Sequence, residues 1–258
     1  MNYILSQSSR QVLERFAARR VLLAFDYDGT LAPIVADRDR AFLRPATRKV
    51  LAQAARRYPC AVISGRARPD VLRLLGGVKL ACVVGNHGLE WEQTAHAASI
   101  ERQVRAWLTR METLLADIPG LVIEDKRYSL TVHFRRARRK AQAAAAIRQA
   151  AASLGKVRII GGDHVVNVVH PAAPHKGKAL QRIQEMLQCP AAIYIGDDVT
   201  DEDVFALRRP QRLLSIRVGA SRRSKAPYYI RNQQEIDELL ACLLSLREEP
   251  SPGRRLSQ

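Results

Sequence analysis

The chain has 258 residues, of which 47% are hydrophobic, and a formal net charge of +17. This length and composition allow a large buried core and exclude wholesale disorder. No apolar run is long enough to span a membrane, and the charged N-terminus lacks the features of a secretory signal, so we expect a cytoplasmic protein. The cysteines are widely spaced and form no CxxC pair, which favours structural thiols over a redox or zinc site. They are Cys60, Cys82, Cys189 and Cys242.

The positive charge suggests nucleic-acid binding as an alternative function. However, the basic residues are scattered, with local clusters at 135–140 and 222–225, and aromatic residues that could stack on bases make up only 5% of the chain. A solvated surface, or an electric field that attracts anionic substrates, accounts for the charge better. We therefore expect no nucleic-acid partner.

The first third of the chain alternates apolar runs with helices. The run at 21–30 ends in acidic residues and a glycine, and a helix is predicted from Pro45 to Arg57. A second run at 60–67 ends in Ser-Gly-Arg-Ala, a helix follows at 69–75, and a third run at 79–88 ends in Gly-Asn-His-Gly. Short apolar runs joined by helices predict a parallel sheet covered by helices on both faces.

The middle of the chain has a different pattern. It predicts a helix at 95–117, a strand-like segment at 121–135, an alanine-rich helix ending near Gly155, and strands at 157–162 and 164–170. This order favours a small α+β module inserted into the larger domain.

The last part returns to the first pattern. An apolar run at 191–202 ends in carboxylates, the segment 213–220 resembles a last strand, and 234–246 a final helix. The predicted division is a core in two parts, an inserted cap and a flexible tail: 1–92 with 170–248, 93–169, and 249–258.

The segment Asp26-Tyr27-Asp28-Gly29-Thr30 is the strongest chemical signal. Two carboxylates two residues apart after a strand can face one cation, and Gly29 permits a tight turn. One carboxylate can attack phosphorus while the other handles the proton of the leaving group. A calcium loop is excluded, because the glycine comes too early and no glutamate closes a twelve-residue loop.

The segment 196–203 is a second acidic cluster after an apolar run. Its like charges repel unless a cation or hydrogen-bond donors compensate, and magnesium suits such oxygen ligands. Helix capping by Asp and Thr is an alternative that can hold at the same time.

Two further polar features are weak signals when taken alone. Ser64 and the backbone after it can bind a phosphoryl oxygen, and Lys176 can neutralise charge on the transferred group, although a lone lysine is often only solvated. The stretch is not a P-loop, since Ala172 replaces the first glycine and no Ser or Thr follows Lys178. Polar residues thus follow four apolar runs, and in a parallel sheet they meet at one edge.

In this order, the four elements resemble the haloacid dehalogenase (HAD) superfamily of phosphohydrolases. Six segments further resemble the trehalose-6-phosphate phosphatase family over about 10–246: FDYDGTLAPIV, ISGR, GNHGLE, IEDKRYSLTVHFR, GDDVTDEDVF and VGASRRSKAPYYI. The resemblance implies an α/β fold, a HAD-like Rossmannoid core with an inserted α+β cap. It implies hydrolysis of trehalose 6-phosphate, a small-molecule sugar phosphate, with Mg2+ as cofactor, and we expect a monomer.

The resemblance also implies a role for each matched residue. Asp26 would form an aspartyl-phosphate, Asp28 would act as acid and then as base, and Ser64 with Lys176 would hold the phosphoryl group. The implied metal residues are Asp26, Asp28 through its backbone carbonyl, Asp197, and Asp201 in support of the ion's water shell; Asp198 is a further candidate.

The implied sugar-binding residues come from both domains: Arg66, Asn86 and His87 from the core, and Glu124, Lys126 and Ser129 from the cap. Glu124 and Lys126 are two residues apart, which places them on the same side of a strand, whereas Ser129 needs a bend to join them. Surface charge alternation is the alternative explanation for this pair.

One stretch departs from the family pattern. The family usually carries a glutamate and an arginine before the phosphate-binding lysine, and here Val168 and His170 stand at the best-matching positions. If that glutamate contacts sugar, Val168 cannot replace it. His170 is a candidate pH-dependent substitute for the arginine, or a packed or solvated histidine.

Three alternatives therefore stay open. The first is a phosphatase of the same type that acts on a different phosphorylated disaccharide or glycosyl phosphate. The second is a nucleic-acid-binding protein, and the third is a sensor that binds a sugar phosphate without turnover. The sensor is disfavoured because sensing alone needs no nucleophile.

Overall fold

The computed structural model describes residues 1–91, 97–162, 164–171, 173–207 and 209–248. The predicted tail, 249–258, lies outside these ranges. The core contains a seven-stranded parallel sheet in the order β1-β11-β10-β9-β2-β3-β4. Its strands are β1 (Asn2–Tyr3), β2 (Val21–Phe25), β3 (Cys60–Ile63), β4 (Cys82–Val84), β9 (Ala191–Gly196), β10 (Leu213–Val218) and β11 (Tyr228–Ile230). Its helices are α1 (Arg10–Ala17), α2 (Pro45–Arg57), α3 (Arg68–Leu74), α6 (Lys176–Met186), α7 (Glu202–Phe205) and α8 (Ile236–Glu248).

Helices cover both faces of this sheet, as β2 shows residue by residue. Val21, Leu23 and Phe25 belong to the apolar cluster that the sheet forms with α1, α2, α3 and α8. Leu22 and Ala24 point the other way, into the cluster formed with α6 and α7. Because successive side chains in a strand alternate between faces, a strand buried on both faces must be apolar throughout. The predicted α/β core is confirmed.

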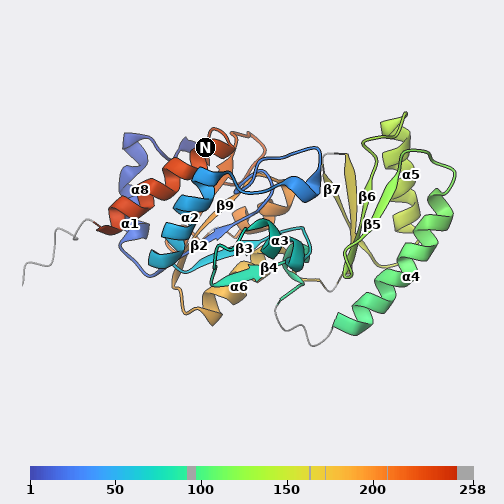
Figure 1. Ribbon diagram of the computed structural model, residues 1–258, viewed down its shortest axis with the longest axis horizontal. Helices are drawn as coiled ribbons and strands as arrows, with labels where there is room; N and C mark the ends of the chain where they lie inside the picture. Colours follow the sequence, from blue (N-terminus) through green and yellow to red (C-terminus); the bar gives the residue numbers. More distant parts are fainter. Residues whose placement is uncertain (92–96, 163, 172, 208, 249–258) are drawn as a thin grey trace, which may run out of the picture.

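The cap is a four-stranded antiparallel sheet in the order β5-β6-β8-β7. Its elements are α4 (Ala97–Leu115), β5 (Val122–Asp125), β6 (Ser129–His133), α5 (Lys140–Ala152), β7 (Arg158–Gly162) and β8 (Val165–Val169). Both helices pack on the side of the sheet that faces away from the core (Figure 1). The side turned toward the core carries buried polar residues, among them Thr131, which donates to Asn167 at 2.7 Å.

Two local predictions were wrong. The segment 121–135 is not one strand but the hairpin β5–β6, because the backbone turns at 126–129: the N–H of Lys126 donates to the carbonyl of Ser129, and Arg127 has φ +70°. The segment 213–220 contains β10 but is not the last strand, since β11 pairs with it in parallel. β11 has only three residues and follows a proline, so its pattern is too short to recognise in the sequence. The predicted domain boundaries remain predictions, and residues 92–96 lie outside the described ranges.

Candidate active site

The turns after four neighbouring strands meet at the carboxyl edge of the core sheet. Asp26 follows β2, Ser64 follows β3, Asn86 follows β4 and Asp197 follows β9. The structure therefore brings together residues separated by up to 171 positions (197 − 26) at the place where the cap approaches the core. This convergence is a direct consequence of parallel strand order.

Lys176, the first residue of α6, lies at the centre of the site. It is 1% exposed, and its Nζ is 2.9 Å from an oxygen of Asp26 and 2.8 Å from Oδ1 of Asp201. Burial alone would lower the pKa of Lys176, but attraction to Asp201 and Asp26 raises it above its ordinary value. Lys176 is therefore a permanent cation beside the predicted nucleophile.

Asp201 is fully hydrogen-bonded. Its Oδ1 accepts from Lys176 and, at 2.6 Å, from the hydroxyl of Tyr194, while its Oδ2 accepts from the backbone N–H groups of Asp197 and Asp198, both at 2.9 Å. A carboxylate with both oxygens engaged is better suited to hold its neighbours in place than to bind an ion directly. This fits a supporting role at the metal.

Asp26, Asp197 and Asp201 form a candidate metal centre. One oxygen of each lies within 4.8 Å of the others. Burial, with the charge of Asp201 adding to it, raises the pKa of Asp197 to about 7, and burial also raises that of Asp26 well above its ordinary value. Both carboxyls thus hold a proton more readily than free ones, a nearby divalent cation would favour their ionised form, and their oxygen donors suit magnesium. Gly29 lets Asp197 approach: with φ +76°, a Cβ built there would lie 2.1 Å from the Asp197 carboxylate.

Arg66 holds both oxygens of Asp28. Its Nε donates to Oδ2 at 2.7 Å and its Nη2 to Oδ1 at 2.6 Å, and the arginine is 3% exposed. Its third nitrogen donates to the carbonyl of Arg38 at 2.9 Å. The predicted acid–base residue is therefore clamped in this state, and Arg66 contacts it directly.

Asn86 and His87 form a strained turn after β4, with φ of 49° and 58°. In this turn the backbone N–H of His87 donates to the carbonyl of Ser64 at 2.8 Å. The Asn86 side chain is buried between the domains. Such left-handed conformations of residues other than glycine are uncommon and concentrate at functional sites.

The three predicted cap residues reach the core. Lys126 donates from its Nζ to the carbonyl of Gly65 at 3.1 Å, and Ser129 donates to Asn86 at 2.9 Å. Asn86 in turn donates to the backbone carbonyl of Lys126 at 3.0 Å. The two-residue spacing predicted that Lys126 lies on a strand with Glu124. This prediction was wrong, because β5 ends at Asp125. Glu124 lies on β5, opposite Thr131 of β6.

Sequence reasoning missed several residues of this junction. Arg38, in the 3-10 helix Arg38–Arg40, forms an ion pair with Glu124, whose same oxygen lies 2.8 Å from Nε2 of His133. Although burial opposes it, the His133 hydrogen bond helps to lower the pKa of Glu124 to about 2. His133 is two residues from Thr131 on β6, so the alternation of side chains along a strand could have placed both on the same face. No local sequence pattern indicates that Arg38 belongs to the site.

The departure from the family pattern has a different meaning in the structure. Val168 is buried in the apolar cluster between the cap sheet and its helices, so it does not face the core, and its neighbour Asn167 lies on the core-facing side. His170 lies 3.0 Å from Gln103 of α4 and stacks on Trp107, which makes it a packed histidine. Val168 thus does not face the predicted sugar site, and of the alternatives for His170 the contacts support the packed histidine.

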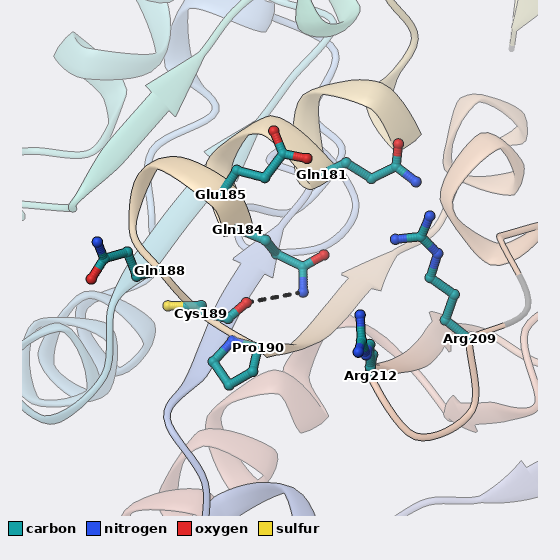
Figure 2. Close-up of a pocket in the computed structure, with 8 residues that line it drawn as sticks. All are labelled: Gln181, Gln184, Glu185, Gln188, Cys189, Pro190, Arg209 and Arg212. Atoms are coloured by element: carbon teal, nitrogen blue, oxygen red, sulfur yellow. Dashed lines mark hydrogen bonds between the residues drawn. The ribbon is translucent and has the colours of Figure 1, made fainter.

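Two of the cavities lined by described residues lie in the core. One of about 570 Å³ borders Gly29 and Asp197 and extends past Pro33 toward Arg231. The other, of about 330 Å³, lies between α6 and the turn before β10, at the opposite edge of the sheet (Figure 2). It contains none of the predicted site residues. No helix within the described ranges is long and apolar enough to cross a membrane.

The strand order and the inserted antiparallel cap place the fold in the HAD class of α/β proteins. Comparison with protein families narrows this class: residues 24–234 match the trehalose-phosphatase family, and the chain belongs to that family. A trehalose-phosphate phosphatase of Mycobacterium tuberculosis is 32% identical over 256 residues, which cover 92% of this chain. The chain spans 60% of the length of that curated relative.

Solved structures show the same fold. The C-terminal domain of C. albicans trehalose-6-phosphate phosphatase superposes with a TM-score of 0.75 at 22% identity, covering 92% of this chain and 96% of that one. The C-terminal domain of a Candida albicans trehalose synthase regulatory protein superposes with a TM-score of 0.68 at 12% identity, covering 91% and 97%. At these identities the likeness shows the fold alone.

Proposed function

We propose that this chain hydrolyses trehalose 6-phosphate to trehalose and inorganic phosphate through a phosphoaspartate on Asp26. The observation that carries this proposal is the buried contact of Lys176 with Asp26 and Asp201 at the carboxyl edge of the sheet. A nucleophile beside a permanent cation suits attack on an anionic phosphoryl group. Membership of the trehalose-phosphatase family and the name of the mycobacterial relative support the substrate.

The proposed reaction has two steps. A carboxylate oxygen of Asp26 attacks phosphorus, the bond from phosphorus to the sugar oxygen breaks, and Asp28 gives its proton to that oxygen. Water then attacks the phosphoaspartate, Asp28 takes a proton from it, and the bond from phosphorus to Asp26 breaks. Ser64 and Lys176 hold the phosphoryl oxygens in both steps.

Magnesium would be held by Asp26, Asp197 and the backbone carbonyl of Asp28, with Asp201 orienting the loop. When bound, it neutralises negative charge at the transferred group. The surplus of carboxylates over cations in the cluster supports this assignment.

Asp28 must leave Arg66 before it can transfer a proton, because both its oxygens accept from that guanidinium. A phosphoryl group is an equally good partner for an arginine fork. We propose that the incoming substrate draws Arg66 away from Asp28, so that Asp28 can take up a proton from solvent, and then donate it, only when the site is filled.

The sugar would bind between the domains, against Glu124, Lys126 and Ser129 of the cap and Asn86 and His87 of the core. Lys126, Ser129 and Asn86 are held by hydrogen bonds across the junction, and a sugar hydroxyl can replace such bonds. A site that pairs its polar groups with substrate hydroxyls rejects analogues without them. We further propose that the enzyme acts as a cytoplasmic monomer.

The test is phosphate release from a panel of sugar phosphates and an aryl phosphate, with magnesium, beside an Asp26→Asn control. The proposal expects trehalose 6-phosphate to be hydrolysed fastest, and no turnover by the variant. Faster hydrolysis of sucrose 6-phosphate or glucose 6-phosphate would overturn the substrate and keep the chemistry. No hydrolysis at all would overturn the enzyme and favour a binding protein.

A further inference from the structure

Arg158, which begins β7, lies on the face of the cap that is turned toward the core. Across the sheet it pairs with Val169 of β8, which in turn pairs with Ser129 of β6. Ser129 donates to Asn86 of the core, and Val169 packs against Leu89 of the core. The Arg158 side chain therefore points into the junction between the two domains.

The Arg158 guanidinium has two nitrogens without a partner. Its Nη1 lies 3.4 Å from the carbonyl of Ala173, whereas Nε and Nη2 are buried and make no hydrogen bond within the described ranges. Nε and Nη2 form the edge by which a guanidinium grips two oxygens at once. Arg66 uses these same two nitrogens to hold the two oxygens of Asp28. Arg158 thus has the same fork, without a partner among the residues that the structure describes.

His87, in the turn after β4, has the same property. Both of its ring nitrogens are buried and find no partner among the described residues. Burial holds the pKa of His87 well below its ordinary value. The positive charges of Lys126, Lys176 and Arg158 lower it further. The ring is therefore neutral and can both donate and accept. It packs on the turn after Ser64, where a Cβ built on Gly65 would lie 2.5 Å from the ring.

Four buried nitrogens on two side chains at the junction between the domains thus have no partner within the described ranges. Buried donors are costly when unpaired, and native proteins rarely leave several together without a ligand to satisfy them. A fork of two N–H groups and a neutral imidazole at the same junction match paired oxygens, whether of a phosphoryl group or of two neighbouring sugar hydroxyls. We propose that Arg158 is a substrate-binding residue whose Nε and Nη2 take two oxygens of the sugar phosphate.

This inference rests on the proposed function and is tested with Arg158→Gln, which removes the charge and the fork. We expect KM for trehalose 6-phosphate to rise about 10-fold or more, the effect of losing charge-assisted hydrogen bonds. Arg158→Lys keeps the charge without the fork, so its KM should lie between those of the wild type and Arg158→Gln. The matched control is Arg148→Gln, at an exposed position on the outer helix α5, which should leave KM unchanged.

Two further ligands identify which oxygens the fork takes. If it grips the phosphoryl group, Arg158→Gln also raises KM for an aryl phosphate and weakens inhibition by inorganic phosphate. If it grips hydroxyls, only trehalose 6-phosphate is affected. Either result supports the inference.

Unchanged KM for both substrates and unchanged inhibition by inorganic phosphate in a folded Arg158→Gln protein would overturn the inference, and the fork would then hold only water. A lower melting temperature with unchanged KM would show a purely structural role and would overturn it as well. A wild-type enzyme that does not prefer trehalose 6-phosphate refutes the proposed function instead, which the wild-type panel reveals before any variant is compared.

Discussion

Lys126 carries a buried positive charge whose cost can be estimated from the structure. The side chain is 7% exposed, and burial, only partly offset by Glu124, lowers its pKa from 10.5 to about 8. A change of this size corresponds to about 3 kcal/mol against the charged form in the folded state. Replacement by methionine removes this cost but also the hydrogen bond from the charged Nζ to Gly65, worth about 2 kcal/mol. We expect Lys126→Met to be about 1 kcal/mol more stable than the wild type at pH 7.

The pH dependence gives the decisive signature. Because the pKa of Lys126 is lower in the folded than in the unfolded chain, the unfolded chain binds more protons between about pH 8 and pH 10.5. The free-energy cost of burying charged Lys126 in the folded wild type is complete below this pH window, and it disappears as the pH rises through the window. The stability advantage of Lys126→Met should therefore shrink when pH is raised from about 7 to about 9.5.

Urea unfolding at the two pH values measures this difference, with Lys156→Met as the control at an exposed position. Sugar-phosphate turnover by Lys126→Met should fall at the same time, since functional sites commonly trade stability for activity. If the variant is less stable than the wild type at pH 7, or if its advantage is the same at both pH values, the reasoning about the buried charge is wrong.

Three other predictions concern the carboxylate cluster. Asp26→Asn should lower turnover about 1,000-fold or more, because it removes the nucleophile, whereas Asp203→Asn at an exposed position of the same segment should stay near wild type in the phosphate-release assay. Gly29→Ala should abolish activity and magnesium binding because its Cβ would displace Asp197; Gly219→Ala, at φ +78° with open space around it, is the control for backbone strain alone, and equal losses in both would refute the clash. Calorimetry should find magnesium affinity falling about tenfold per pH unit below about 7, where a proton competes at Asp197, and a flat affinity would show that this carboxylate is already ionised.

Much of the candidate active site can be predicted from local patterns. Asp26, Ser64, Asn86 and Asp197 each follow an apolar run, and the rule that parallel strands end at one edge brings them together without any further information. The helix from Pro45 to Arg57 was predicted at its observed bounds for a similar reason, since it begins at a proline and keeps one apolar face.

Errors arose where a prediction depended on turns or on strand faces. The hairpin between Asp125 and Ser129 depends on one residue, Arg127, in a left-handed conformation that no strong turn signal announces. The inference about Val168 depended on which face of β8 it occupies, and one step along a strand reverses that face. Matching sequence motifs alone cannot tell which face of the strand a residue occupies.

The sequence by itself determined the fold class, the family resemblance and the set of residues at the carboxyl edge, because strands, turns and acidic motifs are properties of short segments. Only the tertiary structure decided that Arg66 holds Asp28, that both oxygens of Asp201 accept hydrogen bonds, and that the Arg158 fork, turned toward the core, has no partner in the described part of the chain. These contacts join residues far apart in the chain. Their existence depends on strand register and on the approach of the cap, which the packing of the whole molecule sets.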